Sequence, residues 1–506
     1  MRRAALCVLL AASCLCGGSG SGAMAATATA AGDAAGGPGY VVEQVSIPLF
    51  GMVKVYRPEP IQATRGVVLF VSGDGGWNLG VVEMARRSAS RAIVVGLSMP
   101  AWQKVAQKDP AHCWFPAGDL ESTAQAIEKI YRLPQYIRPI LVGYSSGATV
   151  VYGALAQAPA ETFTGGVSLG FCPDMELARP FCSRGDWKPT YDAKKKTSLL
   201  PPRAGLSPRP DGSPRWIALQ GMVDQVCDPK QVGRFVSGIP AARMVPLPRV
   251  GHGFSVARNW GAAFDSAIEG LLAPATVLEP APGGTRRSES HLPNHSPEEI
   301  RDRLDALDLP LEIQWLDGAR SVLIFLSGDG GWAELDQSVT SALAAQGVGV
   351  VGWNTLRYFW QPKTPDEFRA DLARVVAALP EGMRVYAGGF SFGAEVVPVS
   401  LSPGSGDALS RIAGLVLLGP GPYATFEVSP LDWIRTGESP TDHPVAAALE
   451  RLDGLPVLCL DAAQHGPSGC PSATIRGLTH VNMPGGHHFG GDYDALAARI
   501  LDFMRH

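Results

Sequence analysis

The chain has 506 residues, which is room for two or three domains. It carries 43 Lys and Arg residues against 47 Asp and Glu residues, for a formal net charge of −4, and 46% of its residues are hydrophobic. These values are ordinary for a globular protein. With no basic tract interleaved with aromatics, they exclude the strong positive field that nucleic-acid binding needs.

The first 25 residues have the pattern of an export signal. Arg2 and Arg3 form a positive start, a compact apolar run follows over residues 4–12, and Ala23-Met24-Ala25 matches a small-x-small cleavage site. We therefore predict a cleavable signal peptide over residues 1–25, followed by a small, flexible leader over residues 26–38.

Two alternatives exist for this N-terminal segment. An uncleaved membrane anchor is disfavoured because the apolar run is too short to span a bilayer comfortably. A lipoprotein signal acylated at Cys14 is disfavoured because the preceding residues lack the usual leucine three places upstream. No later segment of the sequence is long and apolar enough to cross a membrane.

The rest of the chain is a tandem repeat. Each half begins with an apolar run that leads into the hexapeptide SGDGGW, and the same series of apolar runs and helix-length segments follows. Runs that are apolar throughout are typical of parallel strands covered by helices on both faces. The runs and their final loops lie at residues 66–71, 91–99, 138–148, 165–171, 215–221 and 249–254, and again at 321–328, 347–353, 384–394, 413–419, 455–461 and 483–489.

The two halves are separated by residues 273–296, which are rich in Pro, Gly, Ser and charge and are expected to form a linker. The sequence therefore predicts two α/β domains. The N-terminal domain covers residues 39–272 and the C-terminal domain covers residues 297–506, each with a mostly parallel sheet flanked by helices.

A G-x-S-x-G pentapeptide follows an apolar strand and precedes a helix in both halves. This is the signature of the nucleophile elbow of α/β hydrolases, where a sharp turn between strand and helix tolerates only small neighbours. The pattern is weak alone, but it has the right flanks twice. We therefore expect tandem α/β-hydrolase domains with Ser145 and Ser391 as nucleophiles.

A serine nucleophile needs a base, which in this fold comes last in chain order. His252 in VGHGF and His487 in PGGHHF occupy matching places near the ends of the two halves. A single histidine would more often be a surface or core residue. Two at equivalent positions favour a catalytic role.

The third member of each triad is an acid that orients the histidine. In the first half Asp224 follows a strand at the usual offset, with Asp228 as an alternative. In the second half Asp461 stands at the strand end, and Glu427 and Asp432 are alternatives.

The SGDGGW loops are expected to supply part of the oxyanion hole, since a tetrahedral intermediate needs two backbone N–H donors. One donor comes from the residue after the nucleophile and the other from this glycine-rich loop; the alternative is a turn needed only for folding. The expected groups are Gly73, Asp74, Gly75 and Ser146 in the first half and Gly328, Asp329, Gly330 and Phe392 in the second.

Six cysteines follow the signal segment, an even number that suggests disulfides in an exported protein. The short-range candidates are Cys172–Cys182 and Cys459–Cys470, and Cys113–Cys227 would complete the set. The alternative is a few buried free thiols. No cluster has the spacing of a zinc site, so neither a metal nor another cofactor is predicted.

Several motifs together resemble the AcvB/VirJ family of bacterial virulence-associated periplasmic proteins. They are the paired SGDGGW, GFSFGAEVVP (389–398), LRYFWQPKTP (356–365) and GGHHFGGDY (485–493). The two-domain length resembles AcvB rather than the single-domain VirJ. The resemblance covers nearly all of the mature chain and is densest in the second half. The chain departs from it in the acid loop, DAAQHGPSG (461–469).

This resemblance implies an α/β-hydrolase fold, a periplasmic location and hydrolysis of aminoacyl-phosphatidylglycerol, typically lysyl-phosphatidylglycerol. It places the activity in the C-terminal domain, with Ser391 as nucleophile and His487 as base. The ammonium groups of such a substrate would favour acidic neighbours, for which Glu395, Asp329 and Asp492 are candidates. A cap or ion pair within its helix is an equal alternative for Glu395.

The expected partners are therefore an aminoacylated phospholipid and a membrane surface, with links to a type IV secretion system. The competing hypothesis is a non-catalytic periplasmic protein that supports such a system. A peptidase or a generic lipase is a third possibility, but the sequence has no clear apolar lid of the kind that a lipase carries.

Overall fold

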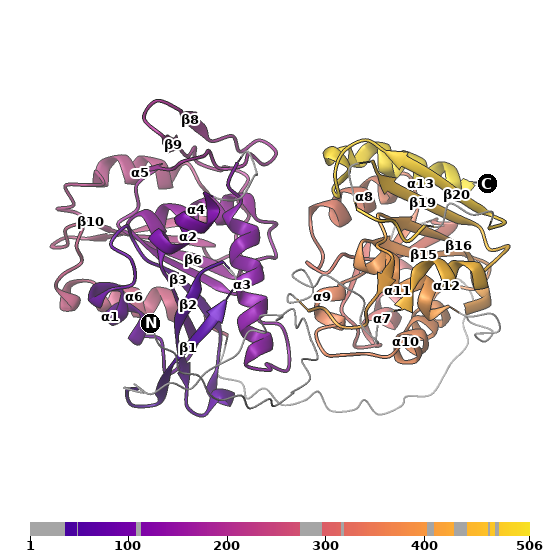
Figure 1. Ribbon diagram of the computed structural model, residues 1–506, viewed down its shortest axis with the longest axis horizontal. Coiled ribbons are helices and arrows are strands. Elements are labelled where there is room, and N and C mark those ends of the chain that lie inside the picture. Colours follow the sequence, from indigo (N-terminus) through magenta and orange to yellow (C-terminus); the bar gives the residue numbers. More distant parts are fainter. Residues whose placement is uncertain are drawn as a thin grey trace, which may run out of the picture.

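The computed structural model describes residues 36–47, 49–107, 113–273, 296–314, 318–401, 409–429, 443–463, 466–470 and 475–505. The expected signal peptide and nearly all of the expected leader and linker lie outside these ranges. The described residues form two α/β domains that lie side by side (Figure 1).

The first domain is built on an eight-stranded sheet in the order β1-β2-β4-β3-β5-β6-β10-β11. β1 and β2 form an antiparallel hairpin at one edge, and the strands from β4 to β11 are parallel. The strands are β1 (Tyr40–Ile47), β2 (Gly51–Pro58), β3 (Val67–Val71), β4 (Ile93–Leu97), β5 (Ile140–Tyr144), β6 (Gly165–Leu169), β10 (Trp216–Gly221) and β11 (Ala242–Leu247).

Helices cover both faces of this sheet, as continuous apolar strands require. α1 and α6 bury their apolar sides in the core of one face, and α2 to α5 pack on the other. A small antiparallel sheet of β7 (Asp174–Glu176), β9 (Thr197–Leu199) and β8 (Thr190–Asp192) is inserted after β6. The helices are α1 (Leu79–Arg86), α2 (Met99–Ala106), α3 (Pro116–Ile130), α4 (Ser146–Gln157), α5 (Pro229–Ser237) and α6 (Gly261–Glu269).

The second domain repeats this plan with one edge strand fewer. Its seven-stranded sheet has the order β12-β14-β13-β15-β16-β19-β20, and only the β12–β14 pair is antiparallel. The strands are β12 (Leu311–Gln314), β13 (Ser321–Leu326), β14 (Gly349–Trp353), β15 (Arg384–Phe390), β16 (Ile412–Leu418), β19 (Val457–Ala462) and β20 (Leu478–Met483).

In this domain α8 and α13 cover one face, and α7 and α9 to α12 cover the other. A short pair, β17 (Tyr423–Ala424) and β18 (His443–Pro444), lies apart from the main sheet. The helices are α7 (Pro297–Asp305), α8 (Glu334–Ala345), α9 (Thr355–Tyr358), α10 (Pro365–Ala378), α11 (Phe392–Ser400), α12 (Val445–Arg451) and α13 (Tyr493–Arg505). The tandem α/β fold predicted from the sequence is confirmed.

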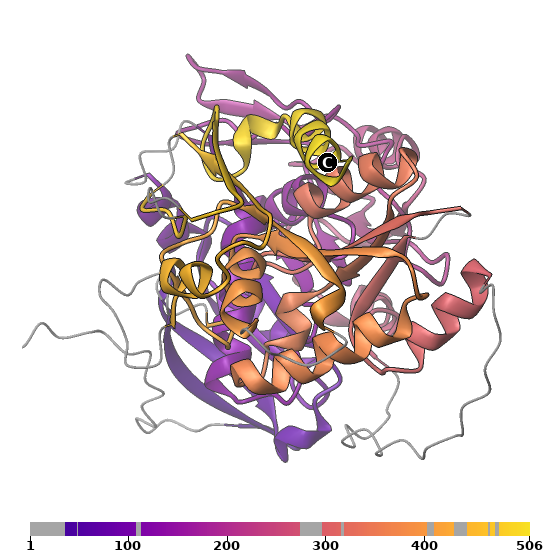
Figure 2. The ribbon, with the colours of Figure 1, turned by 90° about the vertical axis from the view of Figure 1, so that its right-hand side faces the viewer.

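The two domains are joined through α3 and the segment that follows it. The indole N–H of Trp360, at the end of α9, donates to the Leu133 carbonyl over 2.9 Å, and the ring packs against Tyr136. Lys129 donates to the Trp360 carbonyl and forms an ion pair with Glu427 at 2.8 Å. Trp360 is only 1% exposed, so the first domain completes its burial. Figure 2 shows the second domain in front of the first along this contact.

The described residues contain three disulfides, in a pairing that corrects two of the expected three. Cys459–Cys470 forms as predicted, whereas the other bonds are Cys113–Cys182 and Cys172–Cys227. Cys172 does not pair with Cys182, although that cysteine is near it in the sequence. It lies just after β6, and in the parallel sheet the next strand is β10, whose following loop carries Cys227.

Within the described part of the chain, no helix has the length and hydropathy to cross a bilayer.

Candidate active site

Both expected nucleophiles stand at sharp strand-to-helix turns. Ser145 lies between β5 and α4 with φ 56° and ψ −123°, and Ser391 lies between β15 and α11 with φ 51° and ψ −118°. A positive φ is unusual for a residue other than glycine, and it persists only where the surroundings enforce it. The nearly identical angles show that the two elbows are built in the same way.

The glycines of each elbow make that turn possible. A Cβ at Gly147 would lie 2.4 Å from the Ser72 carbonyl oxygen, and one at Gly393 would lie 2.5 Å from the Leu326 carbonyl oxygen. The helix therefore passes directly over the loop that leaves the first parallel strand. This close approach is what brings the serine beside the SGDGGW loop.

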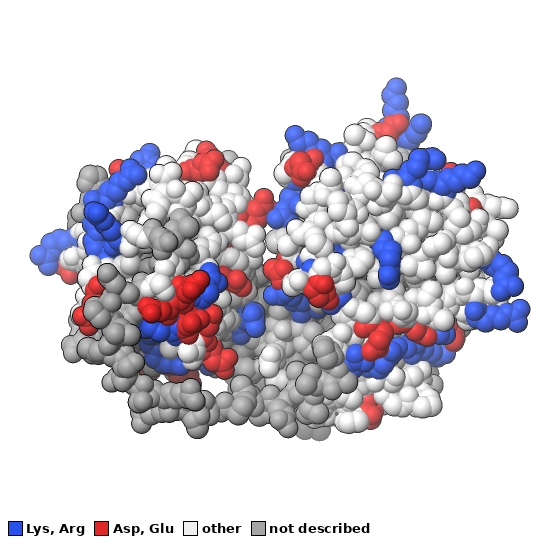
Figure 3. Space-filling model, turned by 180° about the vertical axis from the view of Figure 1, so that it is seen from behind, with Lys and Arg blue, Asp and Glu red and all other residues white. Residues whose placement is uncertain are grey.

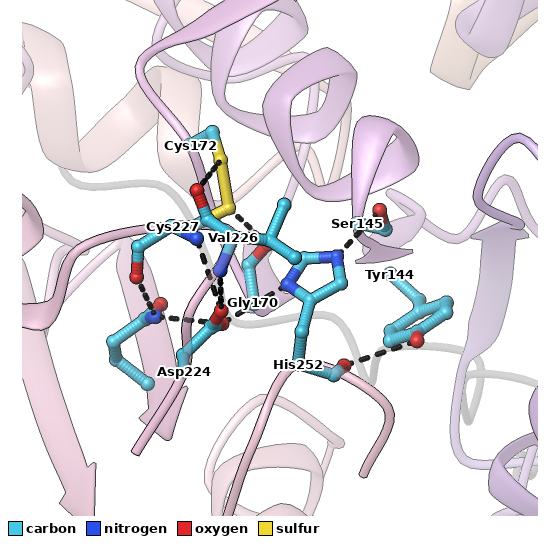
Figure 4. A network of polar contacts seen from close by, with 9 residues as sticks. Tyr144, Ser145, Gly170, Cys172, Asp224, Val226, Cys227 and His252 are labelled. Carbon is cyan, nitrogen blue, oxygen red and sulfur yellow. Dashed lines mark hydrogen bonds and ion pairs between the residues drawn. A yellow bond between two sulfur atoms is a disulfide. The ribbon is translucent and has the colours of Figure 1, made fainter. Parts of the chain in front are cut away.

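The first domain holds a complete Ser-His-Asp arrangement (Figure 4). His252 Nε2 lies 2.9 Å from Ser145 Oγ, and His252 Nδ1 lies 3.0 Å from Asp224 Oδ2. An ionised carboxylate can only accept hydrogen bonds, so Nδ1 carries the proton and Nε2 is left to accept from the serine hydroxyl. This is the geometry in which a histidine acts as general base.

Asp224 is held firmly in this role. Its carboxylate accepts from the backbone N–H groups of Val226 and Cys227 and from the side-chain amide of Gln220. The Cys172–Cys227 disulfide ties the same loop to the end of β6. The alternative acid, Asp228, instead accepts from Lys230 N and caps α5.

The second domain brings Ser391 and His487 together in the same way. His487 Nε2 lies 2.9 Å from Ser391 Oγ, and the imidazole ring stacks at 4.8 Å from the ring of Phe390. Gly419 follows β16 with a positive φ, and a Cβ there would meet His487 at 3.6 Å. Gly170 has the same relation to His252 in the first domain. The histidine loops are therefore equivalent.

The structure does not bring Asp461 to His487. Its carboxylate accepts from His480 Nε2 on β20 at 2.7 Å. Asp461 is the penultimate residue of β19, and Gln220 is the penultimate residue of the equivalent strand β10. Asp224, in contrast, lies three residues beyond the end of β10. Three residues beyond Ala462 is His465, which lies outside the described residues. Asp461 therefore takes the place of Gln220 rather than that of Asp224.

Of the two other acids predicted as alternatives for the second triad, one forms a different contact and one lies outside the described residues. Glu427 forms the interdomain ion pair with Lys129. Asp432 lies outside the described residues.

Each SGDGGW segment forms a tight turn against its nucleophile. Gly76 N donates to Gly73 O over 2.9 Å, and Gly331 N donates to Gly328 O over 3.0 Å. A Cβ at Gly73 would lie 3.0 Å from Ser145 Cβ, and one at Gly328 would lie 3.8 Å from Ser391 Cβ. Both loops therefore lie beside their nucleophiles, and their part in an oxyanion hole stays a prediction.

The residues after the nucleophiles complete this arrangement. Ser146 and Phe392 are the first residues of α4 and α11. The N–H groups of a first helical turn have no partner within their helix, so they are available to a developing negative charge. Asp74 and Asp329 occupy the second position of the two turns, and their roles as oxyanion-loop residues remain predictions.

The serine and the tryptophan that both hexapeptides contain have structural roles. The indole rings of Trp77 and Trp332 lie over Gly96 and Gly352 of the neighbouring strand, where a Cβ would approach each ring to 2.3 Å. The serine that opens each hexapeptide accepts a hydrogen bond from the first residue of α2 or α9: Met99 N donates to Ser72 Oγ, and Thr355 N donates to Ser327 Oγ. The repeated tryptophan is therefore a packing residue.

The pockets of the two sites differ. The cavity at Ser145 measures about 340 Å³ and is lined by the first domain alone. The cavity at His487 measures about 580 Å³ and lies between the domains, with His488 and the Gly328–Asp336 segment on one wall. The opposite wall belongs to the first domain and includes Phe115, Glu121, Tyr136, Arg138, Glu161 and Arg184. Figure 3 shows the notch between the domains from behind.

Acidic groups surround the second site. Burial raises the pKa of Glu395 to about 7, a hydrogen bond from Gly421 N opposes the shift, and the charge of Asp329 adds to it. Burial likewise raises the pKa of Asp336 to about 8. Burial lowers the pKa of His488, against the opposing charges of Glu334 and Asp329. Asp492, an expected substrate ligand, instead accepts from Ala495 N at the start of α13.

Two groups of described residues have metal-like spacing, Asp224-Cys227-His252 and Cys459-Asp461-His480. The cysteine of each is consumed in a disulfide. A thiolate is therefore not available in either group.

The strand order, the strained serine elbow and the late histidine together define each domain as an α/β hydrolase in fold. Residues 320–506 match the family model described as bacterial virulence protein (VirJ). Among curated proteins, none matches the sequence.

Several solved structures are similar to the chain at low identity. An α/β serine hydrolase without a lid from Xanthomonas campestris is 20% identical, with 46% of this chain and 95% of that one covered and a TM-score of 0.31. A dienelactone hydrolase from Anabaena variabilis is 14% identical, with 38% and 88% covered and a TM-score of 0.27. Est1E from Butyrivibrio proteoclasticus is 9% identical, with 46% and 98% covered and a TM-score of 0.29.

Proposed function

We propose that the protein is a periplasmic serine esterase that hydrolyses the aminoacyl ester of aminoacyl-phosphatidylglycerol, of the lysyl type. The observation that carries the proposal is the Ser391–His487 pair, 2.9 Å apart, at a large cavity with acidic walls. An ester of a cationic amino acid needs a nucleophile beside groups that attract ammonium.

In the first step Ser391 Oγ attacks the aminoacyl carbonyl carbon while His487 Nε2 takes the hydroxyl proton. The negative charge on the carbonyl oxygen is stabilised by backbone N–H groups of Phe392 and of the Gly328–Gly330 turn. The carbon–oxygen bond to glycerol then breaks, and the imidazolium returns its proton to the glycerol oxygen. Water repeats the sequence on the acyl-enzyme and releases the free amino acid.

The acidic surroundings favour an aminoacyl rather than a fatty-acyl substrate. Glu395 and Asp329 are close enough to the site and to each other for their charges to interact. The α-ammonium of an aminoacyl ester lies two bonds from the reacting carbon, so it enters the same region. A fatty-acyl chain would instead bury apolar surface against these carboxylates at a cost.

The test is amino-acid release from lysyl- and alanyl-phosphatidylglycerol in mixed micelles. Wild type, Ser145→Ala, Ser391→Ala and the double variant are compared. We expect release to be lost with Ser391→Ala and retained with Ser145→Ala. Loss with Ser145→Ala alone would move the activity to the first domain. No release from wild type would favour a non-catalytic protein that supports a type IV secretion system.

A second candidate function concerns the first domain, because its Ser145-His252-Asp224 arrangement is complete. We propose that it is a second esterase site. The loops that carry Asp224 and His252 also carry exposed aliphatic side chains: Met222, Val223, Val226 and Val256. Such a rim beside an open site suits contact with a membrane surface or a lipid chain. Labelling with a fluorophosphonate in a Ser391→Ala background tests it, since an inert Ser145 would remain unlabelled.

A further inference from the structure

We infer that the first domain completes the substrate pocket of the Ser391 site, where Glu121 and Asp329 form a shared binding site for a primary ammonium group. This inference rests on the proposed function, whose ammonium-bearing substrate it explains. It assigns to the first domain a role that does not depend on the chemistry of Ser145.

Helix α3 is fixed against the second domain. Lys129, near the C-terminal end of α3, bonds to Glu427 and lies 4.5 Å from the centre of the Trp360 ring. A second ion pair, Arg184–Glu334 at 3.1 Å, joins the domains on the far side of the same cavity. Glu121 lies two turns before Lys129 on α3 and lines the cavity, so its position relative to Ser391 is set by these contacts.

No described residue neutralises the carboxyl group of Glu121. Among the described residues, none forms a hydrogen bond or an ion pair with its side chain. Its strongest electrostatic neighbour is another acid, Asp329. Burial between the domains raises the pKa of Glu121 to about 8, and the charge of Asp329 raises it further. A buried acid facing an acid is costly unless a cation comes between them.

Tyr136, on the same wall of the cavity, provides an independent observation. The Tyr136 hydroxyl is buried and has no hydrogen-bond partner among the described residues, although the residue lines the cavity. Its charge interaction with Glu121 shows that the two groups are neighbours. A buried hydroxyl without a partner is uncommon in a native protein and marks a place where a ligand can bind.

Two of the arginines that line the cavity are already paired with carboxylates. Arg138 is paired with Glu161 and Arg184 with Glu334. Arg357 lies on the second-domain wall, and its charge acts on Glu312. Glu121 and Asp329 line the same cavity from the two domains, and their charges interact. A primary ammonium has three donors, which Glu121, Asp329 and the Tyr136 oxygen can accept together.

The test uses the full chain in a Ser145→Ala background, so that only the second site reports. The selectivity is the ratio of kcat/KM for lysyl-phosphatidylglycerol to that for p-nitrophenyl acetate, a neutral ester. We expect Glu121→Gln to lower this ratio about tenfold or more, through a higher KM for the lipid, because a charge-assisted contact is lost. Glu83→Gln makes the same change on the outer helix α1, where Glu83 pairs with Arg86, and is expected to match the parent.

Two further arms separate this inference from the proposed function. Tyr136→Phe keeps the ring that packs on Trp360 and is expected to lower the same ratio by a smaller factor. Lysinamide, which carries the ammonium groups without the lipid, is expected to inhibit p-nitrophenyl acetate hydrolysis competitively in the parent and about tenfold more weakly in Glu121→Gln.

An unchanged ratio and unchanged lysinamide inhibition in Glu121→Gln would overturn the inference. If the parent releases no lysine from the lipid, the proposed function fails, and the lysinamide arm alone then decides the inference. Weaker inhibition in Glu121→Gln would still support an ammonium site shared by the two domains.

Discussion

The two halves of this chain share one fold but differ in their catalytic residues and in the size and lining of their pockets. The first has a fully connected Ser145-His252-Asp224 set and a cavity of about 340 Å³ formed by its own residues. The second has the Ser391–His487 pair, an acid engaged with His480, and a cavity of about 580 Å³ that needs both domains. The pockets can differ while the two elbows stay alike, because each elbow is set by backbone contacts.

The largest expected difference concerns the acids. Asp224→Asn is expected to lower the activity of the first site by about 10⁴-fold, because the amide cannot hold the catalytic tautomer of His252. Asp461→Asn is expected to change the second site less than about tenfold, since its carboxylate bonds to His480. p-Nitrophenyl acetate hydrolysis in Ser391→Ala and Ser145→Ala backgrounds measures the two effects. Equal losses would show that Asp461 orients His487 after all.

The disulfides provide the next comparison. Replacing Cys172 and Cys227 by alanine is expected to lower the free energy of unfolding of the first domain by about 2–4 kcal/mol, since their loop separation is 55 residues. The same change at Cys459 and Cys470, 11 residues apart, should cost about 1 kcal/mol less. Urea denaturation of the two double variants tests this order. A larger loss for the short loop would contradict the loop-length argument.

The paired tryptophans predict a smaller and symmetrical effect. Gly96→Ala and Gly352→Ala each place a methyl group against an indole ring, and each is expected to destabilise its own domain by about 1–3 kcal/mol. Gly466→Ala, where a Cβ would meet no atom within 4 Å, is the matched control. Thermal unfolding of the three variants is the measurement, and a neutral Gly352→Ala would show that Trp332 can move away.

The smallest effect is the pH dependence of stability that Glu395 contributes to the second half. The pKa of Glu395 is raised to about 7 in the folded protein, so between its ordinary value and pH 7 the unfolded chain loses this proton while the folded protein keeps it. Stability therefore falls as the pH rises through this window. Glu395→Gln removes the dependence and should gain about 1–2 kcal/mol on wild type between pH 4.5 and 7.5. Parallel stability curves for the two proteins would contradict the raised pKa.

Much of the fold could be predicted because its central strands are continuous apolar runs and its elbows have a five-residue signature. The sequence did not predict the edge strands β1, β2, β11, β12 and β20, because their partly exposed residues lack that continuous pattern. The pairing of Cys172 with Cys227 depends on the neighbouring positions of β6 and β10, which no local pattern records.

The site was predictable to the extent that it repeats. Ser145 and Ser391, and the two histidines, occupy matching places, and the structure brings each pair together. Asp461 could not be placed from spacing, because one or two residues of uncertainty at a strand end decide which neighbour its carboxylate meets. No pattern in the sequence indicated a functional role for Glu121. It lies within an ordinary helix, and only the packing of the two domains puts it at the Ser391 pocket.

The most direct test of the central claim is to trap the covalent intermediate. The protein is mixed with lysyl-phosphatidylglycerol, quenched in acid within milliseconds and digested, and the peptides that contain Ser391 and Ser145 are examined by mass spectrometry. Our account predicts a lysyl adduct on the Ser391 peptide that disappears in Ser391→Ala and in His487→Ala. An adduct confined to the Ser145 peptide, or lysine release with no adduct on either serine, would contradict it.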